Sequence, residues 1–208
     1  MTRRKHNNNR QRQLIAQQAA KILAKSGNRD YLAAKNKAVE RLGILDSKQL
    51  PTNSEIEIAL IEYQRLFCSD EQPEIVNSLR LAALKAMKLF SDFSPKLVGS
   101  VLAGTSDKHS PVHLHVFADT SEDLTVFLIN QHIPYEIGEQ KVRYGHDNLE
   151  TQATINFYAG DIRFLLTVFV AEGKKQIPMS PITAKTMQRA NLNEVEKLVE
   201  ASNLGLQG

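Results

Sequence analysis

The sequence predicts an α+β fold in which an all-helical N-terminal region precedes a mixed or antiparallel sheet with helices. Apolar residues recur at helical spacing through the first third of the 208 residues. After Pro95 the pattern changes to short strand-like runs, and the pair Gly160-Asp161 is typical of a hairpin turn. Apolar residues make up 42% of the chain, which is enough for a hydrophobic core. The order of helices before strands therefore favours the α+β class.

The N-terminal region divides into an arm and a helical domain. Residues 1–12 are polar and basic and predict a disordered arm. The helical domain is expected over residues 13–75. Its first helix is expected to end at Gly27, and its second is expected to begin at an Asp30 cap and to end at Gly43.

A capping box predicts the start of the third helix. Ser54 is followed three residues later by Glu57, and this spacing lets each side chain bond the backbone N–H of the other. The helix is expected to continue to about Phe67. A fourth helix is expected over residues 74–90, where apolar residues again recur at helical spacing.

The α+β domain is expected over residues 76–172. Its predicted strands cover residues 96–102, 112–117, 135–144, 151–158 and 162–170. The last of these, Ile162–Val170, is the most apolar run in the chain, and it predicts a central strand buried on both faces. Residues 173–208 are expected to form a C-terminal segment with a short helix over 193–201.

Charge is distributed unevenly along the chain. Residues 1–48 hold 12 Lys and Arg against 3 Asp and Glu, a net charge of +9. Residues 49–208 hold 14 against 20, a net charge of −6. A basic front end on an acidic body indicates a polyanionic partner. The basic side chains expected to contact RNA or DNA are Arg3, Arg4, Lys5, Arg10 and Arg12.

Several classes of protein are excluded by composition. The single cysteine, Cys68, allows no disulfide within the chain and no multi-cysteine metal site. No apolar run approaches the roughly 20 residues of a membrane span, so no membrane partner is expected. The basic start is followed by no apolar run typical of a secretory signal, so we expect a cytoplasmic protein. The oligomeric state is left open by the sequence.

The stretch most informative about function lies at residues 98–116. Gly99-Ser100 follows a predicted strand, Gly104-Thr105 comes next, and a second strand follows. Glycine lets a backbone approach a ligand closely, and free backbone N–H groups beside a serine suit a phosphate. The residues expected to bind the phosphate of a nucleotide are therefore Gly99, Ser100, Gly104 and Thr105.

This arrangement resembles the signature of the nucleotidyltransferase superfamily typified by DNA polymerase beta. In that family a Gly-Gly or Gly-Ser pair is followed about ten residues later by Asp-x-Asp on the next strand. A later strand adds a third carboxylate, and the three hold two Mg²⁺ ions that align an attacking hydroxyl with the α-phosphate of a nucleotide. The resemblance implies a fold and a candidate site.

The acidic positions of the family are altered in this chain. In one alignment Pro111 and His113 replace the two Asp residues, and in a second alignment His113 and His115 replace them. The candidate third strand contains no carboxylate, since Asp161 only precedes it. Because Mg²⁺ prefers oxygen ligands, we expect no catalytic residue, no resident metal and no cofactor. A zinc site formed by His113, His115 and His109 is a weaker alternative.

Resemblance extends to other parts of the chain. The segments DYLAAKNKAVERLG, PTNSEIEIALIEYQRLF and PMSPITAKTMQRANLNEV are similar to an uncharacterised proteobacterial nucleotidyltransferase-like family. The expected function is therefore a catalytically degenerate nucleotidyltransferase-like protein with a binding or regulatory role. One alternative is an active, Mg²⁺-dependent nucleotidyltransferase that recruits Asp107, Asp119 or Asp161. The other is a nucleic-acid-binding protein that uses its basic N-terminal region.

Overall fold

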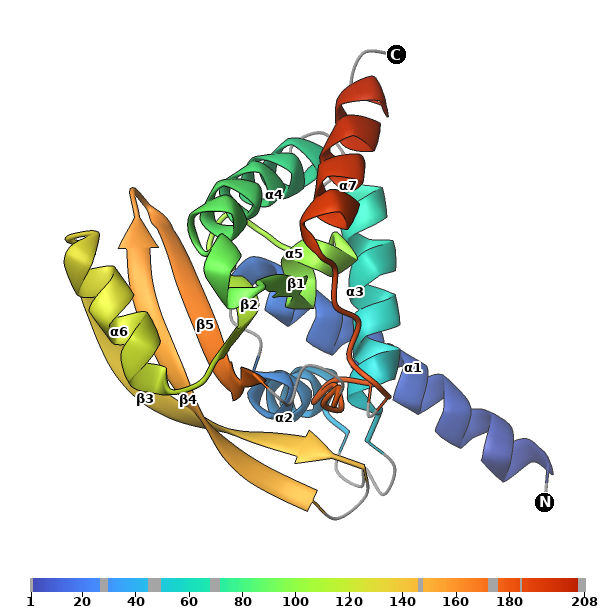
Figure 1. The fold of residues 1–208 in the computed structure, drawn as a ribbon. Coiled ribbons are helices and arrows are strands. Elements are labelled where there is room, and N and C mark those ends of the chain that lie inside the picture. Colours follow the sequence, from blue (N-terminus) through green and yellow to red (C-terminus); the bar gives the residue numbers. More distant parts are fainter. Residues whose placement is uncertain are drawn as a thin grey trace. The chain divides into compact units, whose positions relative to one another are not determined.

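The computed structural model describes residues 2–26, 30–44, 50–67, 72–145, 148–171, 176–183 and 185–205. The chain divides into two compact units, residues 1–72 and 73–208. The first is helical, and the second combines helices with a five-stranded sheet (Figure 1). The predicted α+β class is therefore confirmed.

The first unit consists of three helices. They are α1 (Thr2–Ser26), α2 (Tyr31–Leu42) and α3 (Asn53–Phe67). Small and aliphatic side chains from all three helices form its core: Ile15, Ala16, Ala19, Ala20, Leu23, Ala34, Ala38, Ile56, Ala59 and Leu60. Because many of these residues are alanines, the helices can approach one another closely.

Residues 2–12 are helical, although the sequence predicts a disordered arm there. The helix α1 begins at Thr2 rather than near Gln13. Arg, Lys and Gln are good helix formers, so a polar composition does not by itself prevent a helix from extending. The predicted limits of α2 are confirmed: the Asp30 side chain accepts from the Ala33 N–H, and Gly43 ends the helix with a φ of 64°.

The third helix is capped two residues earlier than predicted. The Glu55 N–H donates to Thr52 Oγ1, and the Thr52 N–H donates to Glu55 Oε2, at 3.2 and 2.7 Å. This reciprocal pair is a capping box, and it takes the place of the predicted box between Ser54 and Glu57. Cys68, the single cysteine of the sequence, lies outside the described residues.

The second unit begins at α4. Its remaining elements follow in chain order: α4 (Gln72–Leu89), the short 3₁₀ helix η1 (Ser91–Phe93), β1 (Lys96–Val98), α5 (Gly99–Ala103), β2 (Val112–Ala118), α6 (Ser121–Asn130), β3 (Tyr135–Tyr144), β4 (Asn148–Ala159), β5 (Ile162–Val170) and α7 (Leu192–Gly205). Helices α4 and α7 lie side by side (Figure 1), and Lys88 of α4 pairs with Glu196 of α7 at 3.0 Å. The C-terminal residues therefore belong to the same unit as the sheet.

The five strands form one mixed sheet in the order β1-β2-β5-β4-β3. The strand β2 pairs antiparallel with β1 and parallel with β5, whereas β5, β4 and β3 pair antiparallel in succession. The predicted central position of Ile162–Val170 is confirmed, since β5 lies between β2 and β4.

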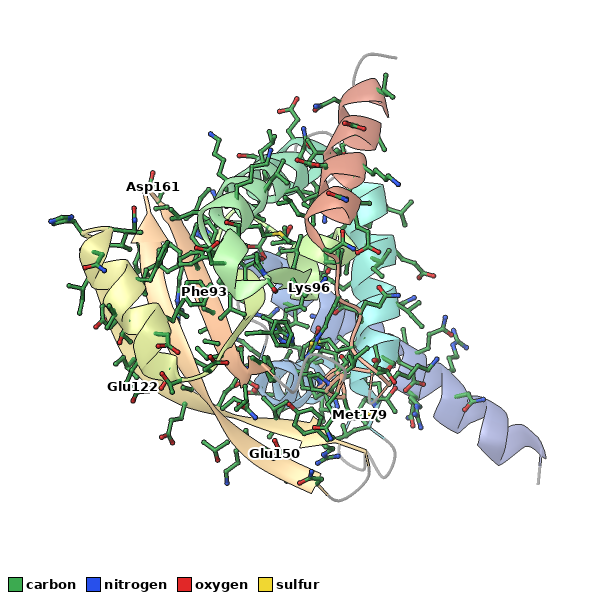
Figure 2. The ribbon with its side chains drawn as sticks, viewed as in Figure 1. Phe93, Lys96, Glu122, Glu150, Asp161 and Met179 are labelled. Carbon is green, nitrogen blue, oxygen red and sulfur yellow. The ribbon has the colours of Figure 1, made fainter. Side chains whose placement is uncertain are left out.

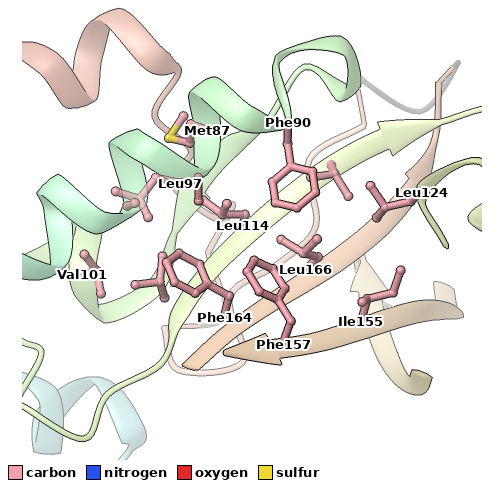
Figure 3. Packing of buried hydrophobic residues seen from close by; sticks show 14 of the residues in the cluster. Met87, Phe90, Leu97, Val101, Leu114, Leu124, Ile155, Phe157, Phe164 and Leu166 are labelled. Atoms are coloured by element: carbon pink, nitrogen blue, oxygen red, sulfur yellow. The ribbon is translucent and has the colours of Figure 1, made fainter. Parts of the chain in front are cut away.

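One face of the sheet carries the main hydrophobic core. Alternate residues of β2 and β5 point to this face, among them Leu114, Phe164 and Leu166, and all three are buried. Figure 3 shows Met87 and Phe90, from and just after α4, packing over these strands. Side chains from α6 and α7 complete the cluster. Because one face is filled by helices, only the opposite face is left for a site on the sheet.

No described helix is both long enough and apolar enough to cross a membrane.

Candidate functional site

The face opposite the main core carries the residues that the sequence singles out on β2. His113, His115 and Phe117 alternate along β2, so their side chains share this face. The register with β5 places Leu165, Thr167 and Phe169 directly beside them. This pairing places the two histidines beside β5, the candidate strand for a third carboxylate. However, none of these six side chains is a carboxylate.

Gly99 and Ser100 form the first turn of a short helix, although the sequence predicts a strand over residues 96–102. The strand β1 ends at Val98, and the backbone then turns because Gly99 adopts a φ of 75°. An added Cβ at Gly99 would meet His113 at an ordinary 3.7 Å, so glycine is required by the backbone angle and not by space.

The predicted phosphate residues do not converge on one point. Gly99 and Ser100 begin α5, whereas Gly104 and Thr105 follow its other end. The N–H groups of Gly104 and Thr105 both donate to the Ser100 carbonyl, and Thr105 is buried. These two residues therefore have no free N–H for a ligand. Of the predicted loop, only the Gly99-Ser100 end is open to a phosphate.

Replacing Gly99 by Ala is expected to destabilise the second unit by about 1–2 kcal/mol, because an L-residue is strained at positive φ. Urea unfolding measures this loss. Gly160→Ala is the matched control, since Gly160 has a φ of 61° and open space around it. Both variants should lose similar stability, but only Gly99→Ala should alter nucleotide binding. Equal effects of both variants on binding would contradict a role for the Gly99 turn.

Arg80 of α4 holds the far end of α5 in place. Its Nε donates to the Val101 carbonyl at 3.2 Å, and its Nη2 donates to the Leu102 carbonyl at 3.1 Å. A cation at the C-terminal end of a helix satisfies carbonyls that have no partner within the helix. Burial lowers the pKa of the Arg80 guanidinium. Arg80 therefore positions the Gly99-Ser100 turn from the opposite end of the helix.

The centre of the candidate site is a contact between His115 and Arg189. Arg189 Nε donates to His115 Nδ1 at 3.1 Å. Its guanidinium lies over the rings of Phe117 and Phe169, at 5.4 and 5.2 Å from their centroids. His115 is only 3% exposed, so it does not line an open groove.

This contact requires a neutral histidine. Burial, followed by the charges of Arg189 and His113, lowers the pKa of His115 to about 3. Nδ1 of His115 then accepts a hydrogen bond from Arg189 Nε, so the ring proton of the neutral imidazole resides on Nε2. Burial also lowers the pKa of the Arg189 guanidinium, an effect that nearby Tyr144 opposes. Arginine nevertheless stays charged, so the site contains a fixed cation.

Arg189 is brought to the sheet by the described residues 176–183 and 185–190, which we call the C-terminal cover. At one end of the cover, the Met179 N–H donates to the carbonyl of Arg143 on β3 at 2.7 Å. At the other end, Ala190 exchanges two backbone hydrogen bonds with Leu97 of β1. The cover thus reaches both edge strands, and Arg189 rests on the middle strands. Beside its second end lies an open pocket of about 450 Å³, lined by Leu102, Gln188, Arg189, Ala190, Glu194, Lys197 and Leu198.

Two carboxylates of the active-enzyme alternative, Asp119 and Asp161, lie far apart. Asp161 lies at the turn joining β4 and β5 (Figure 2), and Asp119 follows the last residue of β2, which pairs with the last residue of β5. A nine-residue strand separates these two ends by about 30 Å. Asp107 Oδ1 accepts from the His109 N–H within its own loop. Among the described residues, no group of three His, Cys, Asp or Glu side chains is placed to hold a metal ion.

The structure describes the side chains of only two of the five basic N-terminal residues, Arg10 and Arg12, and their surroundings differ. Arg10 is exposed on α1, whereas Arg12 forms two hydrogen bonds with Glu55, at 2.7 and 2.6 Å. Arg12 is therefore engaged within the protein and is not free to contact a phosphate backbone. The side chains of Arg3, Arg4 and Lys5 lie outside the part of the structure that can be described.

The ion pair between Arg12 and Glu55 predicts that the stability of the first unit falls in acid. Its hydrogen bonds lower the pKa of Glu55 to about 2, below the unfolded value near 4.5. The stabilisation is therefore present above pH 4.5 and lost as the pH falls towards 2. Because the Glu55 side chain is 40% exposed, Glu55→Gln should cost less than about 1 kcal/mol at pH 6.

Urea unfolding of Glu55→Gln and of the wild type at pH 6, 4 and 3 measures this effect, and the difference between them should shrink with acid. Glu62→Gln changes an exposed carboxylate on the same helix and serves as the control. Its effect should stay within about 0.5 kcal/mol at each pH. A difference for Glu55→Gln that is constant with pH would contradict the prediction.

Arg189 is the residue that sequence reasoning missed. It lies 74 positions from His115, and the segment around it shows no helical or strand periodicity that would place it. The sequence signal available for it is its place in PMSPITAKTMQRANLNEV, one of the segments on which the resemblance was based. Comparisons with known proteins add no assignment: no protein-family model matches the chain, and a search of curated proteins finds no match.

Proposed function

We propose that this chain is a catalytically degenerate nucleotidyltransferase-like protein that binds a nucleotide in a non-catalytic, regulatory role. The observation that carries the proposal is the hydrogen bond from Arg189 to His115. In the family that the sequence resembles, the corresponding strand holds Mg²⁺ ions through carboxylates. Here a histidine stands at that position, and a guanidinium cation is bonded to it.

The residues present do not fit a pair of Mg²⁺ ions. Mg²⁺ requires hard oxygen ligands, and carboxylates supply them best. The side chains on this face of β2 and β5 offer imidazole, phenyl, aliphatic and hydroxyl groups instead, at His113, His115, Phe117, Leu165, Thr167 and Phe169. The neighbouring Arg189 cation would also repel a divalent ion. We therefore derive no nucleotidyl transfer from this site.

Two features support nucleotide binding. Gly99-Ser100 forms a turn between β1 and β2, at the place where the family resemblance puts a phosphate. The neighbouring strands carry Phe117 and Phe169, whose ring centroids lie 5.8 Å apart. Aromatic side chains of this kind stack on nucleobases. The Gly99 turn lies beside His113, four residues or about 13 Å along β2 from Phe117, so a bound nucleotide would bridge that distance with its phosphate at the turn and its base at the aromatic pair.

Calorimetric titration of the full chain with ATP, GTP, CTP and UTP, each with and without Mg²⁺, tests this proposal. We expect binding that is indifferent to Mg²⁺, and we expect Gly99→Ala to weaken it at least fivefold. Binding that requires Mg²⁺, or transfer of a radiolabelled nucleotide to an acceptor, would overturn the degenerate assignment. The absence of binding to all four nucleotides would overturn the nucleotide role.

A further inference from the structure

The C-terminal cover is held to the sheet by few contacts. Among the described residues, three backbone hydrogen bonds connect it to the sheet, one at Met179 and two at Ala190. The other two backbone bonds, from Ser180 to Lys185 and from Met187 to Pro178, are internal to the cover. Between these two ends, the Arg189 side chain bonds to His115. A segment attached in this way can separate from the sheet without breaking the strand pairing.

The described residues of the cover also contribute little to the core. Among them, only Pro178 and Ala190 are buried, and Ile177 is 42% exposed. Since buried apolar area is the main source of folding free energy, the closed position of the cover gains little from it. The sheet beneath gains its stability from its opposite face, where the helices pack.

The closed position also carries an electrostatic cost. Nη2 of Arg189 is buried and has no hydrogen-bond partner in the part of the chain that the structure describes. Among the described residues, no carboxylate forms an ion pair with this guanidinium. A partly desolvated cation without a counter-ion, and a buried donor without an acceptor, both oppose closure. Closure is favoured by the backbone bonds at Met179 and Ala190, by the bond from Arg189 to His115 and by the contact of the guanidinium with two rings.

The surface under Arg189 has the character of a stacking platform. The rings of Phe117 and Phe169 are inclined by 32°, and the His115 ring lies 4.7 Å from that of Phe169. On this platform the planar guanidinium occupies the place that a flat heterocycle would take. Gln140 and Thr167, bonded to each other at 2.7 Å, add polar atoms on the same face.

We propose that the C-terminal cover is a displaceable intramolecular competitor, in which Arg189 occupies the aromatic platform that a nucleobase takes when the cover opens. This inference rests on the proposed function, because it assigns the base-binding part of the same site. It makes Arg189 the residue that holds the cover closed, and it makes ligand affinity depend on how often the cover is open.

Native-state hydrogen exchange, followed by NMR on the full chain, tests the opening. In Arg189→Ala the amides of Met179 and Ala190 should exchange at least tenfold faster than in the wild type, while the amides of β2 and β5 are unchanged. Arg189→Met keeps the methylene packing and should behave in the same way. Lys185→Ala removes an exposed cation from the same segment and should change no rate. Faster exchange of the cover amides together with the strand amides would overturn the proposal. Unchanged exchange rates in both sets of amides would overturn it as well.

Calorimetry with adenosine tests the occupant, since adenosine offers a base without a phosphate. Arg189→Ala should bind adenosine at least fivefold more tightly than the wild type or Lys185→Ala. Equal or weaker binding, or no binding, would overturn the competitor role even if the cover opens. Failure of the proposed function is recognised separately, because it is read from the nucleotide and Mg²⁺ titrations of the wild-type protein.

Discussion

Replacing Phe164 by Ala is expected to destabilise the second unit by about 3–5 kcal/mol, the range found when a buried phenyl ring is removed from a core. Phe164 is 1% exposed on the central strand β5. Its ring stacks on Phe157 of β4, with centroids 4.9 Å apart and planes 8° apart. The substitution therefore removes both buried area and a ring contact. Urea unfolding, followed by far-UV circular dichroism, measures the loss.

Ile137→Ala is the matched control for this experiment. Ile137 lies on β3 of the same sheet but is 66% exposed, so its truncation should change stability by no more than about 0.5 kcal/mol. A loss below 1 kcal/mol in Phe164→Ala would be at odds with a central, doubly packed β5. A comparable loss in both variants would place β3 in the core as well.

Acidification from pH 7 to pH 4 is expected to lower the free energy of unfolding of the second unit by about 3 kcal/mol through the protonation of His115 alone. The folded pKa is about 3, below the unfolded value of 6.5, so the unfolded state binds the proton more readily. The stabilisation is fully present above pH 6.5, and it is lost as the pH falls towards 3. Protonation also places a hydrogen on Nδ1, the atom that accepts from Arg189.

The His115→Gln variant isolates this effect. Its unfolding free energy should vary less with pH than that of the wild type, and the two curves should converge in acid. His132→Gln, which changes an exposed histidine after α6, should reproduce the wild-type pH dependence. Parallel curves for the wild type and His115→Gln would mean that His115 titrates alike in the folded and unfolded protein. The bond to Arg189 would then contribute nothing to stability.

Local signals account for much of the fold that the sequence predicts. Asp30 and Gly43 mark the limits of α2 because their side-chain and backbone chemistry acts within one turn. The apolar run of β5 indicates a central strand because only such a strand is buried on both faces. The error at α3 has a local cause too: Thr52 with Glu55 and Ser54 with Glu57 have the same spacing, and sequence alone does not choose between them.

The parts that the sequence did not predict depend on contacts between distant residues. The sequence places His113 and His115 at the altered acidic positions, but it does not indicate that Arg189, from a segment 74 residues away, bonds to His115. No periodic pattern marks that segment, because hardly any of its described residues face a core. The sequence predicts a strand through Gly99, whereas β1 ends at Val98, because a strand of only three residues is too short to show alternation.

The position of β3 at the end of the sheet affects how copies of this protein behave at high concentration. Most of its ten residues have no strand on their outer side, and such an edge is a template for pairing with another copy. Glu136, Glu139 and Lys141 are exposed along it. Charged side chains make it costly to add a further strand, so they protect the protein against fibrous self-association. Removing them should promote aggregation without loosening the fold.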